Sequence, residues 1–427
     1  MLLAALLLAP LASVPPAPPI PLEPARRAFE ETRLASAEDG GKLWGKPLYG
    51  PMMFVDPKSH FVVTNVADAP GTLHLADGVF TGVLPQSAVV SNTAFDWHAT
   101  RWTMVMWPAV GQTIVQRRRL LLHESFHRIQ EEVGFPSTNP ANSHLDTVDG
   151  RYWLQLELRA LASALRASGE ARATAIGDAA LFRAARRAAA KEGAADDERA
   201  LENNEGLAEY TGFALRGTGD EETRLAVARR LETLDANTSF VRSFAYQTGP
   251  AYGLLLDGAT AIWRKSYRKS DDLCATLLAA AKLTQPPLAD AAARAATYGG
   301  AALRTSEEQR DAQQRARIAA YRKQLVDGPV VELPMQSADF SFDPNDVVAI
   351  DGVGNVYPDL NASGDWGTLA ATRGVLIRSD FSRLVVAAPP GMDAHTRKGD
   401  GWTLTLTSPW IVTRGSRDGD WRVSLTP

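Results

Sequence analysis

One segment constrains the fold more than any other part of the chain: residues 115–134 read VQRRRLLLHESFHRIQEEVG. Its apolar residues recur at helical spacing, and a glycine and a proline follow where a helix would stop. Residues four apart share one face of a helix, so His123 and His127 can bind the same metal ion. Glu124 lies beside them, where a carboxylate can act as a general base on a metal-bound water. The segment therefore predicts a helix with a buried face that carries two metal ligands.

A third ligand is available in a second helical segment, residues 202–213, which read ENNEGLAEYTGF. Glu205 and Glu209 lie four apart and share a face. Two carboxylates on an otherwise apolar helix are costly unless a positive charge lies opposite. We therefore expect Glu205 to be the third metal ligand and Glu209 to orient a ligand imidazole. Glu202, nearly on the same face, remains the alternative ligand.

Two imidazoles and one carboxylate form a donor set that suits zinc. A zinc ion held in this way lowers the pKa of its bound water to about 7, which makes the water a nucleophile near neutral pH. We therefore expect one Zn²⁺ per chain, bound by His123, His127 and Glu205.

HESFH followed by NEGLAEY resembles the gluzincin branch of the zinc metallopeptidases, which includes thermolysin and the aminopeptidase N relatives. The resemblance covers about residues 95–265. It implies that Glu205 is the third ligand and that Glu209 is the acid which supports the metal site. Glu205 follows His127 by 78 residues (205 − 127), more than in those relatives. The longer separation predicts an inserted pair of helices at about residues 150–198.

The segment FAYQTGPAYG adds a further likeness, because aminopeptidase N relatives carry Tyr-x-x-Gly at the start of a helix. The matching residues are Tyr246 and Gly249. The resemblance implies that the Tyr246 hydroxyl stabilises the oxyanion of the reaction. A donor aimed at developing charge favours the transition state over the ground state. His144 and Tyr252 remain alternative donors.

A strand expected at residues 101–108, RWTMVMWP, precedes the motif helix by a short loop. By position it resembles the gluzincin edge strand that binds extended substrate through main-chain hydrogen bonds. The amine-anchoring sequence GxMEN of aminopeptidase N relatives is missing from the chain. An aminopeptidase of that type is therefore not predicted.

The chain falls into three regions by its patterns. Residues 25–110 read as strands and turns, residues 111–325 as helices, and residues 328–427 as short strands of a sandwich or barrel. We therefore expect an α+β fold. Its zincin-like catalytic core would have an N-terminal β-rich part and a helical second half, followed by a C-terminal all-β domain.

The N-terminus predicts export. Residues 1–14 match the apolar run and small residues of a signal peptide, and residues 15–24 read as an extended proline-rich linker. No cysteine follows that could carry a lipid anchor, so we expect a periplasmic or secreted protein. No other segment is apolar and long enough to predict a membrane span.

The net charge of −4 and the pI of about 6.0 give no reason to expect a nucleic-acid partner. We predict a zinc metallopeptidase that hydrolyses peptides or proteins with Glu124 as general base. The first alternative is a zinc hydrolase of a non-peptide substrate. The second is a non-catalytic secreted binding protein on a zincin scaffold, which the intact Glu124 argues against. No feature of the sequence predicts an oligomeric state.

Overall fold

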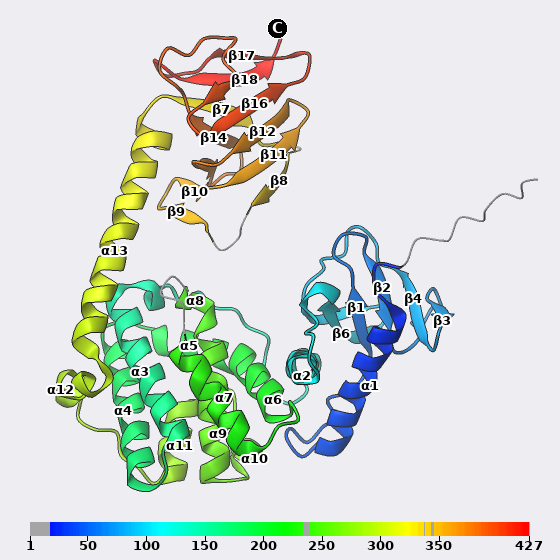
Figure 1. The fold of residues 1–427 in the computed structure, drawn as a ribbon, viewed down its shortest axis with the longest axis vertical. Helices are drawn as coiled ribbons and strands as arrows, with labels where there is room; N and C mark the ends of the chain where they lie inside the picture. The colour runs from blue at the N-terminus through cyan, green and yellow to red at the C-terminus, as the bar shows by residue number, and fades with distance from the viewer. Residues whose placement is uncertain (1–17, 234–238, 337, 343–345, 427) are drawn as a thin grey trace, which may run out of the picture. The chain divides into compact units, whose positions relative to one another are not determined.

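The computed structural model describes residues 18–233, 239–336, 338–342 and 346–426. The chain divides into two compact units, Met1–Arg304 and Thr305–Pro427. The expected succession of N-terminal strands, helical middle and C-terminal strand-rich region is confirmed (Figure 1). The predicted signal peptide and the first residues of the predicted linker lie outside the described residues.

The N-terminal part of the first unit contains a six-stranded sheet in the order β3-β4-β2-β1-β6-β5. Strand β1 pairs parallel with β6, and the other neighbours are antiparallel. One face of the sheet packs with helix α1 (Leu22–Asp39) and with the middle of helix α2 (Ile114–Ile129) in a core that includes Phe29, Phe54 and Leu121. The strands are β1 (Met52–Val55), β2 (Phe61–Thr64), β3 (His74–Ala76), β4 (Val79–Val83), β5 (Thr93–Trp97) and β6 (Thr100–Met106).

The expected extended linker is wrong in its last three residues, because helix α1 spans Leu22–Asp39. Pro24 lies in the first turn, where the missing N–H has no helical partner to lose. The apolar residues of α1 recur at helical spacing, and Ala25, Ala28 and Phe29 are buried. The segment after residue 24 therefore begins with a helix, and the strands of the β-rich part start only at Met52.

The expectation that residues 101–108 form an edge strand is also wrong by one position in the sheet. Strand β6 lies between β1 and β5, so β5 is the edge strand beside the motif helix. Strand β6 is covered on both faces, as a central strand is, and Trp102, Met104 and Val105 are fully buried. The outer edge belongs to Thr93–Trp97, which is only partly buried.

The predicted helical region is confirmed from α2 (Ile114–Ile129) onward. Thr113 begins α2 with a capping box, accepting from the N–H of Gln116 while the Gln116 side chain accepts from Thr113 N–H. The helical pair expected at about residues 150–198 is present as α3 and α4, which pack against each other. The helices after α2 are α3 (Val148–Arg166), α4 (Gly169–Ala188), α5 (Ala194–Leu201), α6 (Leu207–Ala214), α7 (Asp220–Glu232), α8 (Phe240–Ser243), α9 (Ala245–Ala259), α10 (Trp263–Ser266), α11 (Leu273–Ala281), α12 (Ala291–Ala295) and α13 (Gly300–Arg322).

Close backbone contacts hold α6 between α2 and α9. A side chain on Gly212 would meet the carbonyl oxygen of Arg119 in α2 at 2.4 Å. On the other side, a side chain on Gly249 of α9 would lie 2.3 Å from Gly206. Gly206 ends a π-helical turn, Glu202–Gly206, that leads directly into α6. These glycines bring Tyr246, in the first turn of α9, next to Glu205.

A buried ion network fixes the inserted helices to this turn. Arg183 of α4 binds Glu157 of α3, Glu202 of the π-helical turn and Asp272 at the start of α11. Arg186 binds Glu157 and Glu198. Arg183 and Glu157 are both almost fully buried, so removing one would leave the other as a buried charge that has lost a partner.

The second unit is a β-sandwich. Its seven-stranded sheet has the order β17-β18-β7-β14-β13-β10-β9, and its five-stranded sheet has the order β15-β16-β12-β11-β8. One core contains residues of both sheets, among them Val386 and Leu404. The strands are β7 (Val330–Pro334), β8 (Asp339–Phe342), β9 (Val348–Ile350), β10 (Gly354–Tyr357), β11 (Leu360–Gly364), β12 (Gly367–Ala371), β13 (Val375–Arg378), β14 (Arg383–Ala387), β15 (Lys398–Gly399), β16 (Trp402–Leu406), β17 (Trp410–Arg414) and β18 (Trp421–Leu425).

The division between the units falls inside α13, earlier than the change from helix to strand near residue 328. The reason lies in the packing of the end of α13, where Ile318 and Tyr321 contact a second core of the sandwich around Val356 and Leu376. Across the described ranges, no helix has the length and apolar character needed to cross a membrane.

Replacing Arg183 by Ala should destabilise the first unit by about 3–5 kcal/mol, because three carboxylates lose their buried partner. The measurement is chemical denaturation followed by far-ultraviolet circular dichroism. The control is Arg199→Ala, whose partner Asp196 is 72% exposed, and which should cost less than about 1 kcal/mol. Equal losses in the two variants would show that the buried network does not support the fold.

Candidate metal centre

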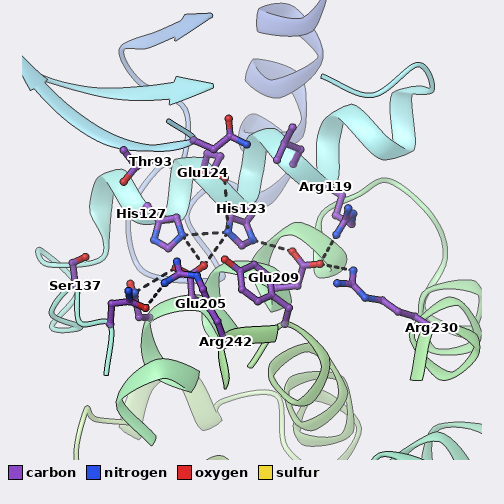
Figure 2. A pocket seen from close by; sticks show the side chains of 15 residues that line it. Thr93, Arg119, His123, Glu124, His127, Ser137, Glu205, Glu209, Arg230 and Arg242 are labelled. Carbon is purple, nitrogen blue, oxygen red and sulfur yellow. Dashed lines mark hydrogen bonds and ion pairs between the residues drawn. The ribbon is translucent and has the colours of Figure 1, made fainter. Parts of the chain in front are cut away.

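Two imidazoles and a carboxylate meet inside the first unit (Figure 2). The Nε2 atoms of His123 and His127 lie 3.2 Å apart. Glu205 Oε2 lies 3.6 Å from the first Nε2 and 3.5 Å from the second. The expected convergence of the two motif histidines with Glu205 is therefore present, and these three residues could hold a metal ion.

The other ring nitrogen of His123 binds the second predicted acid. His123 Nδ1 lies 2.9 Å from Oε2 of Glu209, so the ring N–H donates to a buried carboxylate. The second oxygen of Glu209 accepts from Arg119 and, at 2.6 Å, from Arg230. Glu209 is thus placed as expected, with its charge balanced by two arginines that sequence analysis did not identify.

The ring orientation of His127 is fixed by a chain of amides that starts at a backbone carbonyl. Asn204 Nδ2 donates to the carbonyl oxygen of Thr138, so Asn204 Oδ1 must accept from Gln130 Nε2 at 2.9 Å. Gln130 Oε1 is then an acceptor, and His127 Nδ1 donates to it at 2.6 Å. The proton of neutral His127 therefore sits on Nδ1, and its Nε2 carries a lone pair.

With both Nδ1 atoms engaged as donors, the two Nε2 atoms and Glu205 Oε2 converge as acceptors on one point. Such a cluster is unfavourable unless a cation, either a proton or a metal ion, lies between the acceptors. The shift in the pKa of His123 reflects this need for a cation. Burial lowers the pKa of His123, but Glu124, Glu205 and Glu209 outweigh it and raise the pKa to about 10.

The pKa values of Glu209 and Glu205 are lowered, whereas the pKa of His123 is raised. Burial raises the pKa of Glu209, yet His123 and the two arginines outweigh burial and lower it to about 2. For Glu205 the hydrogen bonds with His123, His127 and Tyr246 likewise overcome burial and hold its pKa far below the usual range. Both acids are therefore ionised at neutral pH.

Glu124 is the unusual carboxylate of the site. Its Oε1 lies 3.9 Å from His123 Nε2. Its Oε2 is buried and has no hydrogen-bond partner among the described residues. Burial raises the pKa of Glu124, although the two histidines oppose the rise. A buried carboxylate oxygen without a partner is free to exchange a proton with a bound molecule.

Tyr246 lies against one of the two histidines. Its ring stacks on His123 with the ring centroids 5.6 Å apart and the planes 9° from parallel. Its hydroxyl hydrogen-bonds with Glu205, and burial together with that carboxylate raises the pKa of the phenol. The hydroxyl therefore stays protonated and can donate.

These groups line a pocket of about 450 Å³. It lies between α2 and the elements that carry Glu205, Glu209 and Tyr246, and Arg242 of α8 reaches it to bind Glu205 at 2.5 Å. The lining residues are Asn92, Thr93, Arg119, Leu120, His123, Glu124, His127, Ser137, Asn139, Asn204, Glu205, Glu209, Arg230, Arg242 and Tyr246.

The alternative ligand Glu202 is not part of this group. Its Oε1 accepts from Arg183 and from Thr248 Oγ1 in the buried ion network. The π-helical turn accounts for the difference, because the extra residue in that turn rotates Glu202 away from the face of Glu205.

The two alternative donors also lie elsewhere. His144 Nε2 lies 2.9 Å from Glu198 and lines a separate pocket with Arg186. The Tyr252 hydroxyl donates to Glu157 at 2.7 Å and is fully buried. Both side chains belong to the buried ion network, where they contact the carboxylates of Glu198 and Glu157.

For two of the site residues that were not predicted, the helical spacing of the sequence carries a signal. Gln130 follows His127 by three positions and Arg119 precedes His123 by four, so both share the ligand face of α2. Arg230 and Arg242 had none, because α7 and α8 reach the pocket only through the tertiary fold.

Comparisons of the chain with protein-family models, curated proteins and solved structures found no match. The resemblance to gluzincins therefore stays a prediction that rests on the motifs and on the geometry of this site.

The raised pKa of His123 can be measured directly. In metal-free protein, the imidazole nitrogens of His123 should titrate in NMR spectra well above pH 6.5. Protonated His123 should therefore stabilise the fold fully below about pH 6.5, with the stabilisation lost as the pH rises toward 10. Replacing Glu209 by Gln should lower this pKa by about one to three pH units, whereas Glu131→Gln, 57% exposed, should not. A His123 pKa near 6.5 in the unaltered protein would contradict the assigned charges.

Proposed function

We propose that the protein is a zinc-dependent peptidase whose metal ligands are His123, His127 and Glu205. One observation carries the proposal. Three acceptor atoms from two separate segments converge on one point, and a buried carboxylate with a free oxygen lies beside them.

The spacing of the three atoms fits zinc. Two ligands of a tetrahedral zinc ion, each about 2.0–2.1 Å from the metal, lie about 3.3 Å from each other. The separations here are 3.2, 3.5 and 3.6 Å. Three protein ligands with one open position are also the pattern of catalytic zinc sites. The hydrogen bonds of both histidines through Nδ1 add support, because such partners fix the ligating nitrogen.

A bound zinc ion would supply Lewis acidity and lower the pKa of a coordinated water. In this proposal Glu124 accepts a proton from the attacking water at its unpartnered Oε2. It then donates the proton to the nitrogen of the leaving amine. Its burial supports this role, because a raised pKa brings a carboxyl group closer to balanced proton transfer at neutral pH.

Tyr246 would stabilise the negative charge that develops on the scissile carbonyl oxygen. Its phenol is held against His123 by stacking and stays protonated. Its single O–H donates to Glu205 in this structure, so in this proposal it turns from that carboxylate to the oxyanion as the charge develops.

The edge of the N-terminal sheet favours a peptide as substrate. Thr93 of edge strand β5 and its neighbour Asn92 line the pocket. The outer side of an edge strand offers backbone donors and acceptors that an extended chain can pair with. A non-peptide substrate would not use this edge, and a non-catalytic scaffold would not need a buried proton acceptor. Hydrolysis of peptides outside the cytoplasm, as residues 1–14 predict, completes the proposal.

Metal content tests the ligand set. The purified protein should bind one zinc ion per chain, and His123→Ala and Glu205→Ala should each abolish binding. Gln130→Ala should weaken zinc binding by about 10- to 100-fold, because it frees the ring of His127. His74→Ala, an exposed histidine of β3, is the control. Zinc bound equally well by the Glu205 variant would refute the site.

Activity tests the role of Glu124. Glu124→Gln should keep its zinc and lose hydrolysis of a mixed peptide library, measured by mass spectrometry, by about 10²- to 10⁴-fold. Glu131→Gln, on the exposed surface just after α2, should remain active. Undiminished turnover by Glu124→Gln would exclude the general-base role, and zinc binding without any peptide cleavage would favour a different substrate.

A further inference from the structure

The charged side chains of the pocket differ sharply in their exposure. The three carboxylates, Glu124, Glu205 and Glu209, are each at most 4% exposed. The arginine side chains are exposed to 33% for Arg119 and 30% for Arg230, and Arg242 reaches 48%. A molecule that enters the pocket therefore meets positive charge at the surface, while the negative charge is held behind it.

Arg119 and Arg230 share a single carboxylate oxygen. Both donate to Oε1 of Glu209, whose Oε2 is taken by His123 (Figure 2). One negative charge thus faces two guanidinium groups and an imidazole, so the group keeps a positive excess. A guanidinium has five N–H donors. Among the described residues, the Arg119 side chain donates through one nitrogen. Arg230 donates through two, the second to Gln247 Oε1 at 3.0 Å.

The two guanidinium groups are fixed in place from behind. Both lie over the ring of Phe213, at 5.4 Å for Arg119 and 5.6 Å for Arg230. They come from different helices, α2 and α7, and both contact Glu209 and Phe213. Planar donors held side by side in a pocket match the geometry of a carboxylate, which can accept two hydrogen bonds at once.

We propose that Arg119 and Arg230 bind a carboxylate of the substrate, so that the enzyme selects peptides with a negative charge near the cleaved bond. The inference rests on the proposed peptidase function. Only Glu209 and the ring of His123 separate the two arginines from the metal centre, so the carboxylate lies within a few residues of that bond. It belongs either to the peptide C-terminus or to an aspartate or glutamate side chain.

Matched pairs of peptides test the charge requirement without any mutation of the arginines. One pair differs only in a free or amidated C-terminus. The others exchange Asp for Asn or Glu for Gln at single positions. Binding is measured by calorimetry on the zinc-loaded Glu124→Gln variant, and cleavage is measured on the unaltered enzyme. The charged member of one pair should be preferred by about 10- to 100-fold, since a charge-assisted hydrogen bond contributes about 1.5–3 kcal/mol. Preference in the first pair identifies the C-terminus, and preference in another identifies a side chain.

Variants then assign the preference to the two arginines. Arg119→Gln and Arg230→Gln should each reduce the ratio between charged and uncharged peptides to about threefold or less, and Arg119→Lys should restore part of it. Arg229→Gln removes an exposed charge from the same helix, next to Arg230, and should leave the ratio unchanged. The zinc content of every variant is measured as well, because Glu209 contacts both arginines. A loss of zinc would reduce the cleavage of both peptides in a pair. A loss of carboxylate binding would change the ratio between the charged and the uncharged peptide.

The outcomes separate the two proposals. Equal binding and cleavage of charged and uncharged peptides would overturn the carboxylate site and leave the peptidase intact. Discrimination that persists in both glutamine variants would overturn the assignment to Arg119 and Arg230. Preferential binding of charged peptides with no cleavage of any peptide would support the carboxylate site and contradict the peptidase function.

Discussion

Two imidazole nitrogens and a carboxylate oxygen meet at one point in the first unit, and a cation must lie among them. His123 and His127 cannot turn away, because Glu209 and Gln130 hold the other nitrogen of each ring. Without metal, a proton on His123 meets the requirement, which is why the carboxylates raise its pKa to about 10. The surrounding helices keep this unfavourable set of acceptors together, and a divalent ion would relieve it.

Glu205 lies in a π-helical turn that helices α3 and α4 support. Arg183 binds Glu202 on one side of the turn, while Glu205 faces the histidines on the other. The π-helical geometry separates these two acids, although they lie only three residues apart. The long stretch between the motif helix and Glu205 supplies the buried arginine that binds Glu202, whereas Glu205 faces the two histidines.

Sequence reasoning failed where a partner from another part of the chain decided the outcome. His144 and Tyr252 are polar and near the motifs in sequence, yet they bind Glu198 and Glu157 in the ion network. The edge strand was misplaced because strand order in a sheet depends on pairing between distant segments. Helix α1 replaces the end of the expected linker for a local reason. A proline-rich segment favours extended chain, but the first turn of a helix also accepts proline.

The sequence by itself determined the three-region fold and the helical spacing that puts His123 and His127 on one face. It also required a positive partner for Glu205 and Glu209, because helix periodicity and the cost of a buried charge are local properties. The contacts of Gln130 with Asn204 and of Arg119 and Arg230 with Glu209 depend on the tertiary structure. The contacts Gln130–Asn204 and Arg119–Glu209 join the region of α2 to residues more than 70 positions away, and a periodic sequence pattern does not indicate which distant side chains form a hydrogen bond.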